Sequence, residues 1–145
     1  MRTHIIKTLT GWAPADGPSR DAWKKFKLGA YYRADIVKPR SYQHHKLCMA
    51  LLSMTYENQD KYTSFEHFRK AVAIEAGHVD ELIGLDGVIY LQPKSISYDA
   101  LDEVEFTAVF GAMMTVCARL LGSIGLTELE GEVSRYADDK YGRAS

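Results

Sequence analysis

The alternation of hydrophobic and polar positions predicts two strands near the N-terminus. Residues 3–9 alternate loosely, and residues 30–37 place Tyr32, Ala34 and Ile36 on one face of an extended chain. Residues 11–17 contain two glycines and one proline and predict a loop. Ser19 is a candidate N-cap for a short helix over residues 20–28, which Gly29 would end.

Apolar residues at helical spacing dominate the rest of the chain. We predict helices over Tyr42–Glu57, from a Thr63-to-Glu66 capping box to Gly77, over residues 98–121 and over residues 127–136. The expected N-caps are Ser41 for the first of these helices, Ser97 or Asp99 for the third, and Thr127 in a box with Glu130 for the last. A short apolar strand is expected at residues 88–91, before Pro93.

The order of these elements predicts an α+β fold, with a small antiparallel or mixed sheet and about four to five helices packed on it. A chain of 145 residues with 46% hydrophobic and 26% charged residues suits a single domain spanning residues 1–145. Within it we expect a basic β-α-β portion at residues 1–46, a mainly helical portion at residues 47–137 and a frayed tail at residues 138–145.

The chain contains no apolar run of the roughly 20 residues that a membrane helix needs. Its first ten residues alternate in polarity and do not resemble a secretory signal. We therefore expect a cytoplasmic protein that makes no use of a membrane. Cys48 and Cys117 are expected to be reduced, buried thiols.

Positive charge is concentrated in the first third of the chain, although the net charge of the whole is −1. Residues 1–46 contain ten Lys and Arg against three Asp and Glu, whereas residues 47–145 contain eight against sixteen. The two parts carry net charges of +7 and −8. This asymmetry indicates an electrostatically specialised face, unless the two parts fold together and neutralise each other across the surface.

Motifs of catalysis are missing from the sequence: there is no glycine-rich phosphate loop, no G-x-S-x-G and no H-E-x-x-H. His44 and Cys48 are four residues apart and could bind zinc from one helix face, but no further ligand pair lies at tight spacing. The acidic residues at 99, 102, 103 and 105 are expected to interact with a helix dipole. We therefore expect no enzyme, no metal and no cofactor.

Basic and aromatic residues are interleaved between residues 24 and 46, with Tyr31 and Tyr32 among the charges. Single-stranded nucleic acid is bound by such surfaces, because cations follow the backbone and rings stack on bases. Residues 40–46 also span a predicted helix N-terminus, where backbone N–H groups favour a phosphate. The alternative for the rings is packing on the sheet. The candidate nucleic-acid contacts are Lys24, Lys25, Lys27, Arg33, Lys38, Arg40, Tyr42, His44, His45 and Lys46.

Residues 40–52 read R-S-Y-Q-H-H-K-L-C-M-A-L-L and resemble the signature of the phage NinB family, the Orf-type recombination mediators. Arg40, Ser41, Ala50 and Leu52 match that signature outright. The segment His45-Lys46-Leu47 stands where the family has Asn-Arg-Lys, so one positive charge is missing.

Residues 93–98 read P-K-S-I-S-Y and residues 102–106 read D-E-V-E-F. Both blocks resemble a related phage family of unknown function, in which P-K-S-I-S-[FY] precedes D-E-x-E-F. An earlier block of that family, H-[RK]-x-x-x-A-L-L, is matched by His45, Lys46 and residues 50–52. The resemblance covers roughly residues 28–121.

The resemblance implies a homodimeric α+β protein that binds DNA, prefers single strands, and assists a recombinase or annealing protein against single-strand-binding protein. It implies that Arg40, His45 and Lys46 contact DNA. The leading hypothesis is therefore a non-catalytic, phage-encoded recombination or replication accessory protein in the host cytoplasm. It would bind single-stranded DNA, with a recombinase, single-strand-binding protein or host defence protein as a further partner.

The competing hypothesis uses the acidic residues. In it, a phage protein inhibits a host nuclease or defence complex by binding it through an acidic helical surface. That surface would consist of residues 99–105 together with Glu128, Glu130 and Glu132.

Overall fold

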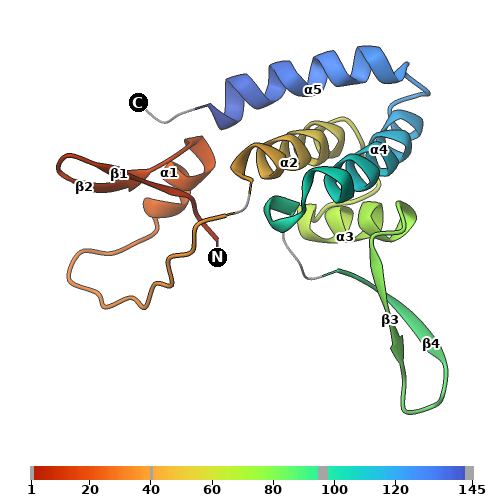
Figure 1. The fold of residues 1–145 in the computed structure, drawn as a ribbon, viewed down its shortest axis with the longest axis horizontal. Coiled ribbons are helices and arrows are strands. Elements are labelled where there is room, and N and C mark those ends of the chain that lie inside the picture. Colours follow the sequence, from red (N-terminus) through yellow and green to blue (C-terminus); the bar gives the residue numbers. More distant parts are fainter. Residues whose placement is uncertain (1, 40, 95–97, 143–145) are drawn as a thin grey trace.

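A computed structural model describes residues 2–39, 41–94 and 98–142 of the chain (Figure 1). The α+β class is confirmed, but within these described ranges two separate two-stranded antiparallel sheets replace a single sheet. The elements in chain order are β1 (Ile5–Thr8), β2 (Gly11–Pro14), α1 (Gly17–Trp23), α2 (Tyr42–Glu57), α3 (Phe65–Glu75), β3 (Val79–Ile83), β4 (Ile89–Pro93), the 3-10 turn η1 (Tyr98–Ala100), α4 (Glu103–Leu120) and α5 (Leu126–Tyr141).

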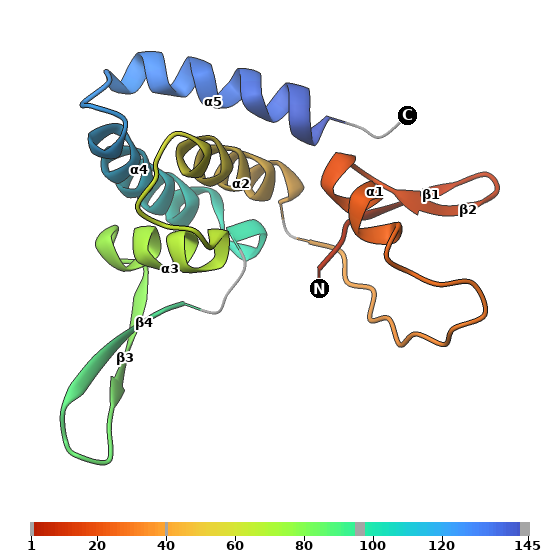
Figure 2. The same cartoon turned by 180° about the vertical axis from the view of Figure 1, so that it is seen from behind.

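The core lies among the helices, with α2 at its centre. Cys48, Ala50, Leu51 and Leu52 of α2 are fully buried. The helix contacts α3, η1, α4 and α5, and the ribbon shows α5 crossing one side of it and α3 lying on the other (Figures 1 and 2). Because helices cover α2 on several sides, its apolar positions extend beyond the single stripe of a surface helix.

Side-chain caps define the starts of three core helices. The Ser41 hydroxyl accepts a hydrogen bond from the backbone N–H of His44 at the start of α2, as predicted. Ser64, not Thr63, caps α3. Asp102 caps α4, so the predicted helix over residues 98–121 divides into η1 and α4. The carboxylate of Asp102 accepts from the Glu105 N–H at 2.8 Å, which fixes the later start.

The last helix is longer than the sequence predicts. It begins after Gly125, which makes no side-chain cap, so the predicted Thr127 box is wrong. It continues to Tyr141 because Ala137 and Tyr141 are buried against the core, and the Tyr141 hydroxyl lies 3.1 Å from Ser53 Oγ. Residues 138–141 are therefore helical and not frayed, while residues 143–145 lie outside the described chain.

The N-terminal portion differs most from its prediction. The predicted loop at residues 11–17 contains β2, which pairs with β1 from Ile5–Pro14 to Thr8–Gly11. Asp16, not Ser19, caps α1 and accepts from the Ser19 N–H at 2.8 Å. This places Pro18 in the first turn of α1, where a missing N–H costs nothing.

The predicted strand at residues 30–37 is wrong for the single chain. This segment has no regular secondary structure, and all of its residues are exposed. Its alternating pattern suits a strand, but no strand in the described part of the chain pairs with it. Without a partner, its backbone N–H and C=O groups have no ladder to join.

A hairpin replaces the single short strand expected at residues 88–91. β3 was not predicted, because its sequence Val-Asp-Glu-Leu-Ile lacks regular alternation. It pairs with β4 in the register Val79–Pro93 to Ile83–Ile89. Gly77, with a positive φ of 81°, ends α3 and turns the chain into β3.

His78, at the start of this hairpin, makes stability depend on pH. It is buried, and burial together with nearby Lys94 lowers the pKa of its imidazole below 6.5. The unfolded chain then binds more protons than the folded chain, so stability falls as pH drops below about 6.5. His78→Leu should flatten the slope of unfolding free energy between pH 6.5 and 5, by at most about 1.4 kcal/mol per pH unit.

Urea unfolding at several pH values measures this slope. The exposed residue His67 supplies the control for removing a histidine, and His67→Leu is measured in parallel. An unchanged slope in His78→Leu would contradict the assignment.

Candidate nucleic-acid interface

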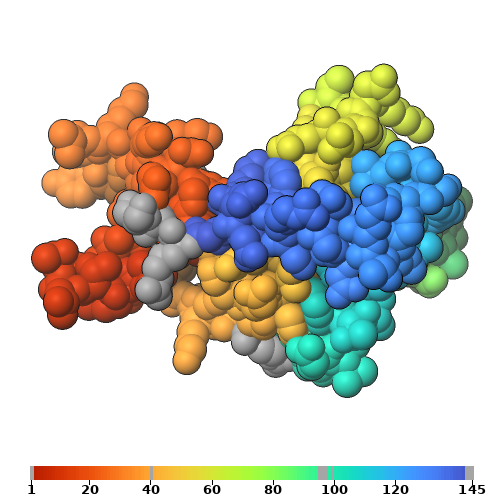
Figure 3. Space-filling model, turned by 90° about the horizontal axis from the view of Figure 1, so that it is seen from above, coloured from red at the N-terminus to blue at the C-terminus, as the bar shows by residue number. Residues whose placement is uncertain are grey.

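Residues 24–39 form an exposed connection between α1 and α2, which we call the basic arm. Every residue from Lys24 to Lys38 is exposed. The arm loops away from α1 before it returns to the start of α2 (Figures 1 and 2), and the orange N-terminal portion stands out from the helical body (Figure 3). It carries Lys24, Lys25, Lys27, Arg33 and Lys38 against Asp35 alone, a net charge of +4.

Two of these cations have acidic neighbours on the surface. Lys24 Nζ lies 3.4 Å from Asp21 Oδ1, and Arg33 Nε lies 3.8 Å from Asp35 Oδ1. All four side chains are at least 72% exposed. Exposed pairs of this kind are weak and screened by salt. Both cations can therefore exchange these neighbours for phosphate groups.

Aromatic rings anchor one half of the arm and leave the other half open. Phe26 lies 4.8 Å from Tyr32 and 6.4 Å from Trp23, between ring centroids. The Tyr32 hydroxyl accepts from the Lys27 N–H, and Trp23 Nε1 donates to Thr3 Oγ1. Tyr31, in contrast, is fully exposed. The Tyr31 ring is therefore available for stacking on a base. It does not pack on a sheet, which was the alternative interpretation of this ring.

The candidates on α2 lie in a different setting. His44 is buried, stacks on Phe106 at 3.9 Å between ring centroids, and has Nε2 2.8 Å from Glu103 Oε2. It joins α2 to α4 and little of its ring is exposed, so this setting does not favour the predicted role of His44 as a nucleic-acid contact. Arg40, a further candidate, lies outside the described residues.

Tyr42 connects α2 to α1. Its hydroxyl donates to the buried carboxylate of Asp16, and burial together with that carboxylate raises the pKa of Tyr42. Lys46 Nζ lies 5.6 Å from the centre of the Tyr42 ring, and the His45 ring lies 4.5 Å from that of His4. These half-buried side chains hold the N-terminal portion against α2.

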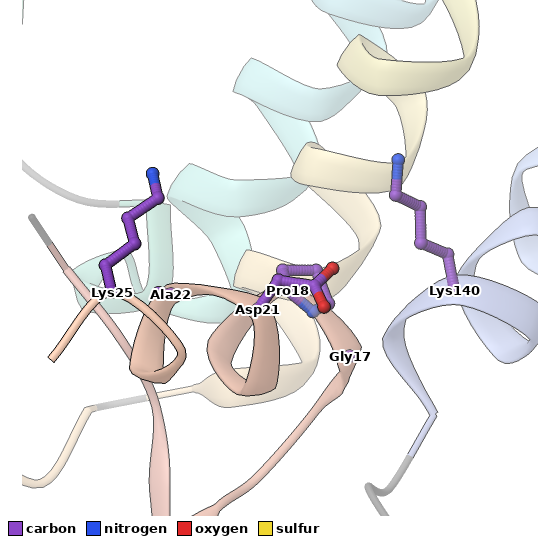
Figure 4. Close-up of a pocket in the computed structure, with 6 residues that line it drawn as sticks. All are labelled: Gly17, Pro18, Asp21, Ala22, Lys25 and Lys140. Atoms are coloured by element: carbon purple, nitrogen blue, oxygen red, sulfur yellow. The ribbon is translucent and has the colours of Figure 1, made fainter.

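A cleft of about 400 Å³ lies beside the start of the basic arm, between α1 and α5. Lys25 and Lys140 line it and rise on either side of Pro18, with Asp21 between them (Figure 4). Lys140 is a cation that sequence reasoning missed, because it lies in the acidic part of the chain. Hydrogen bonding to Tyr136 raises the pKa of Lys140, and its Nζ also lies 3.4 Å from Glu57 Oε1.

A second cleft of about 380 Å³ lies where the N-terminal portion meets α2, α3 and η1. Its charged lining includes Arg2, Asp16, Glu66 and Arg69, which balance in sign. Arg69 Nη2 lies 2.6 Å from Glu66 Oε1 and lowers the pKa of that carboxyl group. This lining gives the cleft no excess of either charge.

The cysteines and acidic residues do not assemble a metal site in the described chain. Cys48 is fully buried and burial raises its pKa, while burial raises the pKa of Cys117 to about 11. Among the described residues, no group of three or more His, Cys, Asp or Glu side chains could hold a metal ion. None of the described helices is long and apolar enough to cross a membrane.

The acidic residues of the competing hypothesis lie in two groups on different helices. Asp102, Glu103 and Glu105 lie at the start of α4, whereas Glu128, Glu130 and Glu132 lie at the start of α5. α5 begins shortly after α4 ends, so the length of α4, about 27 Å, separates the two groups. The two acidic groups therefore lie toward opposite ends of α4.

Comparison with known proteins finds a family model that matches part of the chain. Residues 58–124 match the family described as "Protein of unknown function (DUF1367)". This region contains α3, the β3–β4 hairpin, η1 and α4, and the basic arm lies outside it. No curated protein and no solved structure matches the chain at a significant level.

Proposed function

We propose that the chain is a non-catalytic protein that binds single-stranded nucleic acid on the basic arm. The observation that carries the proposal is a segment, exposed from Lys24 to Lys38, with a net charge of +4 that also presents the fully exposed ring of Tyr31. The arm cations would follow the phosphates and Tyr31 would stack on a base. Lys46 and Lys140 would extend the cationic path at the two sides of the arm.

The proposal includes a biological setting. The resemblance of residues 40–52 and 93–106 to phage families favours a recombination or replication accessory protein acting on single-stranded DNA in the host cytoplasm. A recombinase or single-strand-binding protein would be its functional partner. The competing role, inhibition of a host protein through the acidic helices, loses support because the two acidic groups lie at opposite ends of α4.

Binding of a fluorescent single-stranded oligonucleotide tests the proposal, with anisotropy measured over a range of salt concentrations. If the five arm cations each neutralise one phosphate, the slope of log K against log salt should be about −3 to −4. A matching duplex should bind more weakly, because its bases are not open to stacking on Tyr31.

Tyr31→Ala should weaken single-strand binding by roughly 5- to 100-fold, which corresponds to the loss of one base-aromatic stack. Tyr31→Phe keeps the ring and serves as the matched control, with affinity close to that of the unaltered protein. Equal affinities for Tyr31→Ala and Tyr31→Phe would rule out stacking on this ring.

A further inference from the structure

The β3–β4 hairpin projects from the helical body with little support. The ribbon shows it extending away from the helices in both views (Figures 1 and 2). Apart from each other, its strands contact mainly α3. A two-stranded hairpin alone is only marginally stable in water. Contacts with the rest of its own chain therefore add little to the stability of the hairpin.

Apolar side chains occupy both faces of this hairpin. Paired residues share a face, so Ile83, Ile89 and Leu91 lie on one face, and Leu82 and Tyr90 lie on the other. These five side chains are 47–73% exposed. A hairpin that remains in water normally has at least one polar face. Apolar residues on two faces indicate that another polypeptide covers them.

The turn of the hairpin is well specified despite this exposure. Asp86 accepts hydrogen bonds from the Val88 N–H at 3.0 Å and from the Tyr90 hydroxyl at 2.7 Å. Gly87 takes a positive φ of 81°, and a Cβ at Gly84 would lie 2.7 Å from the Asp86 carboxylate. The turn chemistry thus sets the shape of the hairpin before any partner binds, which lowers the entropic cost of docking.

The basic arm has properties that complement those of the hairpin: an unpaired strand pattern, exposed apolar side chains and positive charge. Residues 30–37 have the alternation of a strand and no strand partner among the described elements. Ile36 and Val37 are 62% and 81% exposed. The hairpin, residues 79–93, carries Asp80, Glu81 and Asp86 without any Lys or Arg, a net charge of −3. Residues 30–38, the part of the arm with this alternation, carry Arg33 and Lys38 against Asp35, a net charge of +1. The two segments match in both apolar character and opposite charge.

We propose that the hairpin of one copy docks on the basic arm of a second copy, and that residues 30–37 add to an edge of the hairpin as a third strand. Strand addition satisfies backbone groups that each copy leaves unpaired. The arm and the hairpin lie at separate ends of the molecule in both views (Figures 1 and 2), which favours contact between copies over contact within one. Two copies form two reciprocal contacts of this kind, as a twofold dimer requires.

This interface does not depend on nucleic-acid binding. Lys24, Lys25 and Lys27 precede the segment that would pair, so their charges remain available to phosphates. The two faces of the added strand also remain distinct, because Tyr31 and Arg33 lie on one face and Tyr32 and Ile36 on the other.

Cysteine cross-linking between two variants tests the contact. Ile36→Cys and Leu82→Cys are prepared separately, and the native Cys48 and Cys117 remain because both are fully buried. After mild oxidation, the mixed variants should give several-fold more covalent dimer on a non-reducing gel than either variant alone. The control is Leu9→Cys mixed with Leu82→Cys. Leu9, at the β1–β2 turn, is more exposed than Ile36 (106% against 62%), yet this mixture should show no such gain.

Two results of the cross-linking experiment would overturn the proposal. One is equal cross-linking in the mixture and in the separate variants. The other is efficient cross-linking of Leu82→Cys alone, which would indicate hairpin-to-hairpin pairing.

Sedimentation provides a second measurement that needs no cross-link. The 16.3 kDa chain should sediment as a dimer, and Ile83→Ser with Leu91→Ser should raise the dissociation constant at least about tenfold. Leu126→Ser, at a residue of similar exposure on α5, should leave it unchanged. A monomer at all accessible concentrations would overturn the proposal.

Charge exchange separates this interface from the nucleic-acid site. Asp80→Lys with Glu81→Lys should weaken the dimer, and mixing this variant with Arg33→Glu/Lys38→Glu should restore association between the two. Lys24→Glu/Lys25→Glu/Lys27→Glu should remain dimeric whether or not it still binds DNA. Failure of one proposal therefore leaves the other testable.

Discussion

Reversing the charges at the start of the basic arm, by Lys24→Glu, Lys25→Glu and Lys27→Glu, is expected to weaken single-strand binding on the order of 100-fold at low salt. The three side chains are exposed, so the folded structure should tolerate the change. Three phosphate contacts would be lost and replaced by repulsion. The slope of log K against log salt should become less negative by about 2.

The matched control places the same change of charge elsewhere. Lys61, Lys94 and Arg135 are exposed cations outside the arm, and their triple replacement by glutamate alters the net charge equally. If binding depends on the local arm, this control should lose only a small part of the affinity. Equal losses in the two triple variants would show that net charge, and not the arm, governs binding.

Leu51→Ala is expected to destabilise the protein by about 2–5 kcal/mol. Leu51 is fully buried in α2, the helix against which the other core helices pack. Its truncation leaves a cavity at a point where several helices meet, so the surroundings can collapse only partly. Because domains of this size are stable by about 5–15 kcal/mol, a substantial share of the stability would be lost.

Urea denaturation followed by far-ultraviolet circular dichroism measures this loss. Leu9→Ala supplies the comparison, because Leu9 is fully exposed at the β1–β2 turn and should change stability by less than about 0.5 kcal/mol. A loss below about 1 kcal/mol for Leu51→Ala would contradict the central position of α2.

Sequence pattern predicts the helical part of the fold well, because helices depend on local signals. α2 runs from Tyr42 to Glu57 as predicted, since Ser41 caps it and its apolar residues recur at helical spacing. Errors of a few residues arise at the other caps. Ser64 and Asp102 cap these helices in the structure, in place of the predicted Thr63 and of Ser97 or Asp99, because tertiary packing decides among neighbouring polar residues.

The strands were predicted less well, because a strand needs a partner that local pattern cannot supply. β2 and β3 have weak patterns and form because β1 and β4 pair with them. Residues 30–37 have the stronger pattern and remain unpaired in the single chain. In the proposed dimer this segment would find its partner in another copy.

The sequence also predicts which cations belong to the candidate site, but not which residues surround them. The exposed cations Lys24, Lys25, Lys27, Arg33 and Lys38 lie where a basic stretch predicts. The sequence could not show that the His44 side chain contacts Phe106 and Glu103, because both residues lie about 60 positions away along the chain. Sequence reasoning likewise missed Lys140, because only folding brings α5 against α1 and places this residue beside the basic arm.

Photochemical cross-linking to a single-stranded oligonucleotide containing 5-bromouracil tests the central claim most directly, because it locates bound bases on the chain. The cross-linked peptides would be identified by mass spectrometry. The account predicts cross-links within residues 24–39, with Tyr31 as the main site. Cross-links confined to α4 or α5, or no cross-linked peptide under saturating conditions, would contradict the assignment of the basic arm as the nucleic-acid interface.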